Sequence, residues 1–146
     1  MMLLTLMLLS PLVTGQNIVM KIDSVTACPQ QATVVVPITY ENFNGVFAIS
    51  LTMEFDTNAL TYQSVQNIHP SLLVGLPVIV NNPVLERDKI KVVYFTLGSG
   101  LNLGSGTLME LVFSHNGTVT DLSWDTTQGN CELADINNQA IATTYI

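Results

Sequence analysis

The feature that most constrains this chain is an alternation of side-chain types from Val46 to Phe55. Large apolar side chains fill every second position of this segment: Phe47, Ile49, Leu51, Met53 and Phe55. A repeat of two residues places successive side chains on opposite faces of a β-strand, whereas a helix repeats every 3.6 residues. The segment is therefore predicted to be a strand with one face in a core.

Similar runs of branched and aromatic residues recur along the chain, separated by Asn, Gly, Pro and Asp. The other predicted strands cover residues 18–25, 33–40, 60–68, 77–82, 89–97, 107–114 and 119–124. Asn116-Gly117 is predicted to form a two-residue hairpin between the last two. No segment has a sustained helical repeat. The fold class predicted is all-β, an antiparallel sandwich or barrel.

Length and charge exclude several classes of protein. A chain of 146 residues provides one domain with a sizeable core. Four basic residues against eleven acidic ones give a net charge of −7. Because so few cations cannot neutralise a phosphate backbone, no nucleic-acid partner is expected.

Residues 1–15 are predicted to be a cleaved signal peptide, which leaves a domain at 16–146 and implies a secreted or cell-surface protein. An apolar run from Met2 to Leu9 is followed by small residues suited to cleavage before Gln16. The run is too short for a membrane span. No Lys or Arg precedes it, so a buried N-terminal strand and a misjudged gene start stay open.

Two cysteines, Cys28 and Cys131, lie near opposite ends of the predicted domain. In an exported protein such a pair is predicted to form a disulfide. Closing so long a loop would contribute about 4–5 kcal/mol in the chain-entropy model. Two separate buried thiols are the alternative. Neither Cys-x-x-Cys nor a Cys/His spacing suited to zinc occurs.

No catalytic apparatus or cofactor site is predicted. His69 and His115 stand in predicted turns, without a nucleophile motif around them. The neighbouring acid pairs, Glu54 with Asp56 and Glu132 with Asp135, are predicted to solubilise or cap turns rather than face one cleft. A calcium site would need Asp121, Asp125 and Asp135 to meet, and no metal site is predicted because the spacing is not that of a calcium loop.

Several short segments occur in an order that resembles a known family. They are Val36-Pro37-Ile38, Met53–Asp56, Lys89–Thr96, Gly106–Leu108 with Leu111–Phe113, and Gly129–Glu132. Together they resemble cohesin domains, the modules that receive dockerins in cellulosomes, and the resemblance extends from about Ile18 to Ile146. It implies a nine-stranded jelly-roll sandwich and a dockerin-like partner. It also implies that the last strand is truncated at Ile146, which would leave the first strand with an incompletely paired edge.

The resemblance further implies that the partner binds the sheet formed by strands eight, three, six and five. The positions that it assigns to this face are Ser50, Thr52, Asn81, Asn82, Val93, Phe95, Asp121, Ser123 and Asp125. The pattern itself supports strand six, because Val93 and Phe95 face outward if Ile90, Val92 and Tyr94 face the core. The alternative is that loops of this chain cover both residues.

The leading functional hypothesis is an extracellular recognition module that binds a dockerin-like partner to assemble polysaccharide-degrading complexes. A carbohydrate-binding module is a second hypothesis, although such modules present rows of exposed aromatic rings, and Trp124 is predicted to face inward. A structural spacer is a third, and the outward Val93 and Phe95 argue against it.

Overall fold

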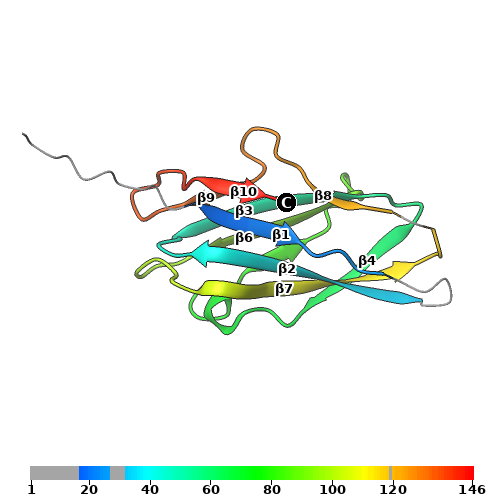
Figure 1. Cartoon of the computed structure of the whole chain (residues 1–146), viewed down its shortest axis with the longest axis horizontal. Coiled ribbons are helices and arrows are strands. Elements are labelled where there is room, and N and C mark those ends of the chain that lie inside the picture. The colour runs from blue at the N-terminus through cyan, green and yellow to red at the C-terminus, as the bar shows by residue number, and fades with distance from the viewer. Residues whose placement is uncertain (1–16, 27–31, 119) are drawn as a thin grey trace, which may run out of the picture.

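The protein is described by a computed structural model that covers residues 17–26, 32–118 and 120–146. Two five-stranded layers of β-structure stack into an elongated sandwich (Figure 1). The predicted signal peptide and Cys28 lie outside the described residues. No helix in the described part of the chain is long and apolar enough to cross a membrane.

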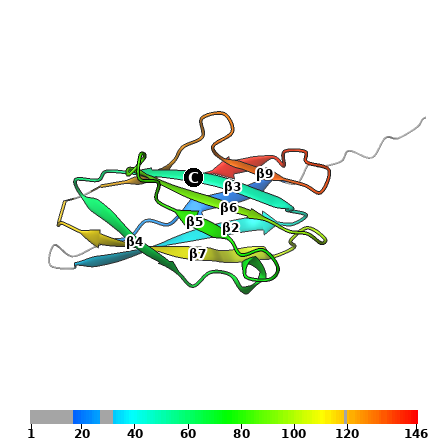
Figure 2. The same cartoon turned by 180° about the vertical axis from the view of Figure 1, so that it is seen from behind.

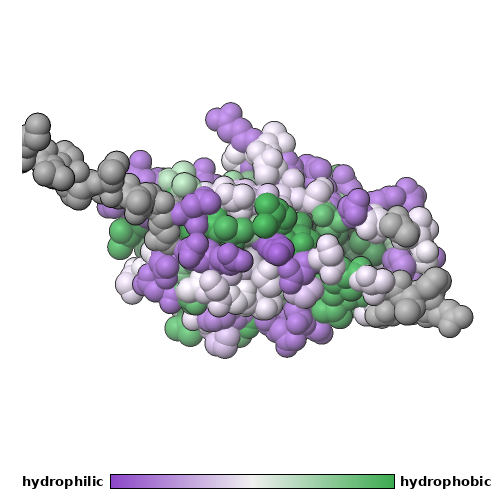
Figure 3. Space-filling view, viewed as in Figure 1, coloured by the Kyte–Doolittle hydropathy of each residue, from purple (hydrophilic) through white to green (hydrophobic). Residues whose placement is uncertain are grey.

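The first sheet has the longest strands. In spatial order it contains β10 (Thr143–Tyr145), β1 (Ile18–Ile22), β2 (Thr33–Phe43), β7 (Gly104–His115) and β4 (Leu60–Gln66). The β1–β10 pair is parallel, and the other pairs are antiparallel. Figure 3 shows hydrophobic side chains interspersed with hydrophilic ones when the molecule is viewed from the side of Figure 1.

The second sheet has the order that the resemblance implies. It contains β5 (Ile79–Asn81), β6 (Lys89–Phe95), β3 (Ala48–Phe55) and β8 (Leu122–Trp124), while β9 (Glu132–Ala134) pairs with another part of β3 (Figure 2). Because β8 and β9 both run antiparallel to β3, they act as one interrupted strand. This interruption explains why the described residues form ten strands where nine were predicted. A short 3₁₀ helix, η1 (Pro70–Leu72), lies between β4 and β5.

The core lies between the two sheets and confirms the predicted alternation. Along β3, Ile49, Leu51, Met53 and Phe55 are buried. Phe113 on β7 is fully buried, and its ring contacts Phe55 and Tyr62 edge-on with centroids 5.3 and 5.9 Å apart. Burial of this much apolar surface stabilises the fold through the hydrophobic effect.

Two local predictions are wrong. The edge of β1 is not left open, because β10 lies beside it and Ile146 exchanges backbone hydrogen bonds with Met20 and Ile22. Asn116-Gly117 does not form a hairpin, because β7 belongs to the first sheet and β8 to the second. The turn instead carries the chain across the end of the sandwich, and the Asn116 amide donates to the Asn58 carbonyl there.

Candidate functional site

The outer face of the second sheet forms a grid of cross-strand neighbours. One row contains Glu132, Ser50, Val93 and Ile79, and the row beside it contains Ala48 and Phe95. On the other side of the Ser50–Val93 row, the next row contains Thr52, Lys91 and Asn81. The row after that contains Ser123, Glu54 and Lys89. The face therefore has an apolar end and a charged end.

At the apolar end, three large side chains stand in solvent. Ile79, Val93 and Phe95 are 61%, 45% and 46% exposed. They lie on the adjacent strands β5 and β6, and Ile79 is directly opposite Val93. Contiguous apolar surface of this kind on a polar protein is typical of a binding site. The alternative that loops of the chain cover Val93 and Phe95 is wrong.

At the charged end, the cations are neutralised by the chain itself. The Lys89 Nζ atom lies 2.8 Å from Asp125 Oδ2 and 3.0 Å from Glu54 Oε1. The Lys91 Nζ atom lies 2.5 Å from Glu86 Oε2. Both lysines thus have acidic partners before any other protein binds.

The interaction between Lys89 and Asp125 shifts the pKa of both groups. Hydrogen bonds from the Lys89 ammonium and then from Thr127 hold the pKa of the Asp125 carboxyl below its ordinary value of 3.8. The same bond to Asp125, together with one to Glu54, holds the pKa of Lys89 above its ordinary value of 10.5. Both groups are therefore ionised at neutral pH.

The interruption between β8 and β9 is fixed by side chains. Asp125 accepts hydrogen bonds from Thr127 and from the Asn130 amide as well as from Lys89. Cys131 Sγ accepts from the Thr52 backbone N–H at 3.4 Å and donates to the Thr52 carbonyl at 3.3 Å. The thiol therefore occupies the Thr52 N–H, while the Thr52 carbonyl accepts from Cys131 and also from the Asp125 backbone N–H at 2.9 Å.

The predicted face residues fall into two groups. Ser50, Asn81, Val93, Phe95 and Ser123 lie on the outer face of the sheet with partial or full exposure. Of the remaining residues, Thr52 and Asp125 belong to this face but are covered, and Asn82 and Asp121 lie off its rows.

Thr52 and Asp125 are only 3% and 6% exposed, contrary to the prediction that both are accessible to a partner. The reason is the segment between β8 and β9, whose Cys131 binds Thr52 and whose Asn130 binds Asp125. Asn82 instead ties the β5–β6 turn together by donating to the Arg87 and Lys89 carbonyls at 3.0 and 2.5 Å.

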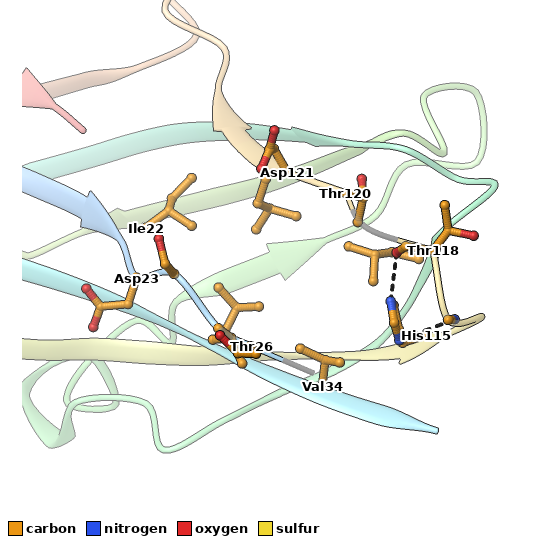
Figure 4. Close-up of a pocket in the computed structure, with 14 residues that line it drawn as sticks. Ile22, Asp23, Thr26, Val34, His115, Thr118, Thr120 and Asp121 are labelled. Atoms are coloured by element: carbon orange, nitrogen blue, oxygen red, sulfur yellow. Dashed lines mark hydrogen bonds between the residues drawn. The ribbon is translucent and has the colours of Figure 1, made fainter. Parts of the chain in front are cut away.

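Asp121 lies at the end of the sandwich, on the rim of a pocket of about 380 Å³ (Figure 4). Ile22, Val34 and Leu122 are among its apolar lining residues, and Asp23 shares the rim. Asp121 precedes β8 and so stands apart from the rows of the sheet face.

The two histidines have structural partners. His69 Nδ1 accepts from the Ser71 N–H at the start of η1. His115 Nε2 lies 2.8 Å from the Thr118 carbonyl, and Nδ1 accepts from the Gly117 N–H. Within the described residues, no group of three or more His, Cys, Asp or Glu side chains is arranged to hold a metal ion.

Cys131 is a free thiol in the structure, and burial raises its pKa. Its proposed partner, Cys28, lies outside the described residues, so the disulfide stays a prediction. The hydrogen bonds of Cys131 to Thr52 give this thiol a structural role that the sequence did not indicate.

Sequence reasoning missed several residues of the face, and Ile79 and Glu132 are the two next to the predicted Val93 and Ser50. Ile79 is the most exposed member of the apolar group, and Glu132 stands beside Ser50 at the opposite edge. A three-residue strand is too short for an alternation to reveal which side chains face out. The signal for Ile79 was its place in a short apolar run before Asn81-Asn82.

A family model described as "Cohesin domain" matches residues 18–145. No curated protein sequence matches the chain.

Solved structures share the fold. The solution structure of CaCohA2 from Clostridium acetobutylicum is 20% identical, with a TM-score of 0.74, and the match covers 90% of this chain and 87% of that one. The sixth cohesin of Acetivibrio cellulolyticus scaffoldin B, solved in complex with a Cel5 dockerin mutant, is 20% identical with a TM-score of 0.72 over 89% and 94%.

A non-cellulosomal cohesin from the archaeon Archaeoglobus fulgidus is 24% identical, with a TM-score of 0.66 over 89% of this chain and 86% of that one. At these identities the likeness establishes the fold.

Proposed function

We propose that this chain, which belongs to the cohesin domain family, is a recognition module that binds a dockerin-like partner through the outer face of the β5–β6–β3–β8 sheet. The observation that carries the proposal is the exposed apolar group of Ile79, Val93 and Phe95 on that face. Apolar side chains surrounded by polar ones form the desolvatable centre of many protein interfaces.

The arrangement of the face supports this binding mode. Ser50, Asn81 and Glu132 are the polar neighbours of the apolar group. A helical partner could bury the three apolar side chains while these neighbours form hydrogen bonds or ion pairs at the rim. Two structural relatives were themselves solved with dockerins bound, one from Acetivibrio cellulolyticus and the other in a CaDoc0917–CaCohA2 complex.

We further propose that the domain acts outside the cell and has no catalytic role. The apolar segment at residues 1–15 supports export, and the domain at 16–146 would then act outside the cell as a non-catalytic assembly module for polysaccharide-degrading complexes. Fusion of residues 1–16 to a reporter enzyme tests export. Cleavage after Gly15 would support this part of the proposal, and retention of the uncleaved reporter in the cell would contradict it.

The experiment for the binding face measures affinity for a panel of purified dockerin modules by titration calorimetry. Phe95→Asp is expected to weaken the strongest complex by at least about 30-fold, because it places a charge in the apolar centre. Leu85→Asp is the matched control, since Leu85 is 97% exposed in the β5–β6 turn, outside the strands of the face. Equal affinity of wild type and Phe95→Asp would refute the proposed face, and lack of binding by every dockerin would refute the proposed partner.

A further inference from the structure

A second surface lies at the edge of the sandwich where β4 and β5 end their respective sheets. A cleft of about 560 Å³ opens there between β4 and the β5–β6 turn. Its lining residues come from three segments: Phe55 and Thr57; Leu60, Thr61 and Tyr62; and Asn82, Val84 and Arg87. None of the side chains that form the apolar end of the sheet face takes part.

The cleft combines an apolar wall with an aromatic ring. Tyr62 is half-buried and fixed edge-on against Phe113, with ring centroids 5.9 Å apart. Val84 is 76% exposed and lines the same cleft from the β5–β6 turn. An aliphatic side chain exposed to this extent in a cleft that also contains an aromatic ring leaves apolar surface that a ligand can cover.

The polar groups of the cleft have unused hydrogen-bonding capacity. Asn82 uses its amide N–H groups to hold the Arg87 and Lys89 carbonyls, which leaves its Oδ1 atom without a hydrogen bond among the described residues. Across all residues that the structure describes, the Arg87 guanidinium likewise has neither an ion pair nor a hydrogen bond. Its five N–H donors are therefore available to a ligand.

The turn that carries these groups is held before any ligand binds. Glu86 N–H donates to the Pro83 carbonyl, Lys89 N–H donates to the Glu86 carbonyl, and the Glu86 side chain pairs with Lys91. A site fixed in this way loses little conformational entropy on binding.

The local charge favours a neutral ligand. Arg87 is followed by Asp88, and Asp56 stands between the lining residues Phe55 and Thr57. Among the described residues of the lining, Arg87 is thus the one that is charged, and it is flanked by acidic neighbours in the sequence, so the cleft is not a basic site for an anion. A neutral molecule with one face of C–H groups and many hydroxyls matches both the Tyr62–Val84 walls and the unused donors and acceptors.

We propose that this cleft binds a neutral oligosaccharide. One sugar ring lies between Tyr62 and Val84, and its hydroxyls donate to Asn82 Oδ1 and accept from the Arg87 guanidinium. The hydroxyls of Thr57 and Thr61 lie at the same cleft and can donate or accept. This site is separate from the sheet face, so it does not depend on the proposed partner.

The test is a titration of the isotope-labelled full chain with cellohexaose and, separately, with xylohexaose, followed by amide chemical shifts. Shifts centred on Tyr62, Val84 and Arg87 with a Kd of about 1 mM are expected for one of these sugars. Arg87→Gln changes an exposed side chain and is expected to leave folding intact and to weaken binding at least about fivefold, and Val84→Asp at least as much. Phe95→Asp is the control and should bind the sugar like wild type.

Three results would overturn the proposal. They are an absence of shifts with either sugar up to 10 mM, shifts centred on other residues, and affinities that Arg87→Gln and Val84→Asp leave unchanged. Glycerol at the same hydroxyl concentration should cause no comparable shifts, and equal shifts with glycerol would also contradict a sugar site.

Discussion

The two ends of the second sheet's outer face differ in whether their side chains already have partners within the chain. At the charged end, Lys89 binds Asp125 and Glu54, and Lys91 binds Glu86. At the apolar end, Val93 and Phe95 stand exposed beside Ile79. Groups that are already paired gain little from a new partner, whereas exposed apolar surface gains free energy when it is covered. The charged end therefore maintains the sheet, and the apolar end is available for recognition.

The largest expected effect comes from removing the apolar end entirely. A variant with Ile79→Ser, Val93→Ser and Phe95→Ser should lose at least about 100-fold in affinity for a cognate dockerin, since apolar side chains at the centre of an interface dominate binding. Its melting temperature should stay near that of wild type because all three side chains are exposed. Calorimetric titration and thermal unfolding measure the two quantities. A large fall in melting temperature with intact binding would reverse the roles assigned to the two ends.

The second effect concerns the charged end, where a substitution should lower stability and leave dockerin affinity nearly unchanged. Asp125→Asn removes the carboxylate from Lys89, Thr127 and Asn130. The melting temperature at pH 7 should fall by roughly 5–10 °C, because a buried group that loses its partner is costly. Dockerin affinity should change by less than about threefold, the range expected for a group outside the contact.

The pH dependence of stability provides a separate check on Asp125. Its folded pKa lies below the ordinary value of 3.8, so its contribution is present above that pH and is lost as pH falls toward the folded pKa. The difference in unfolding free energy between wild type and Asp125→Asn should therefore be constant near neutral pH and shrink below about pH 4. Denaturant unfolding at several pH values measures this difference, and one that grows on acidification would contradict the assigned ion pair.

A smaller effect is expected at the interruption between β8 and β9. Cys131→Ala removes the two hydrogen bonds to the Thr52 backbone and should lower the unfolding free energy by about 1–2 kcal/mol. Cys131→Ser retains a donor and an acceptor and serves as the control. Urea unfolding under reducing conditions compares the variants. Equal stability of Cys131→Ala and wild type would mean that the thiol does not support β3.

The smallest effect is expected for Lys91→Ala. The Lys91–Glu86 pair is well exposed, with 39% and 40% of the two side chains accessible. Such pairs contribute less than about 1 kcal/mol and weaken with salt. Unfolding at low and high NaCl concentration measures the contribution, and a loss above about 2 kcal/mol would show that the charged end is more cooperative than its contacts indicate.

Features that depend on residues close together in the sequence could be predicted, and features that depend on contacts between distant residues could not. Local alternation placed Ile49 and Leu51 in the core and Val93 and Phe95 outside it, and the family resemblance supplied the strand order of the second sheet. Both depend on information that the sequence carries in short segments.

Burial that depends on contacts far apart in the sequence was not predictable. Thr52 alternates correctly to the outer face, but Cys131, 79 residues later, binds its backbone and the side chain is covered. Asn116-Gly117 has the composition of a hairpin turn, but hydrogen bonding to Asn58 accompanies a crossing between sheets. In both cases tertiary contacts override a correct local signal.

The contact between Trp124 and Tyr145 has a consequence for how the sandwich can move. The two rings lie 5.5 Å apart, and Trp124 Nε1 donates to the Ile146 carbonyl, so β8 and β10 are joined across the two sheets. The opposite long side, between β4 and β5, contains the open cleft instead. We therefore expect thermal opening of the two layers to begin along β4 and β5, while β8 and β10 stay joined.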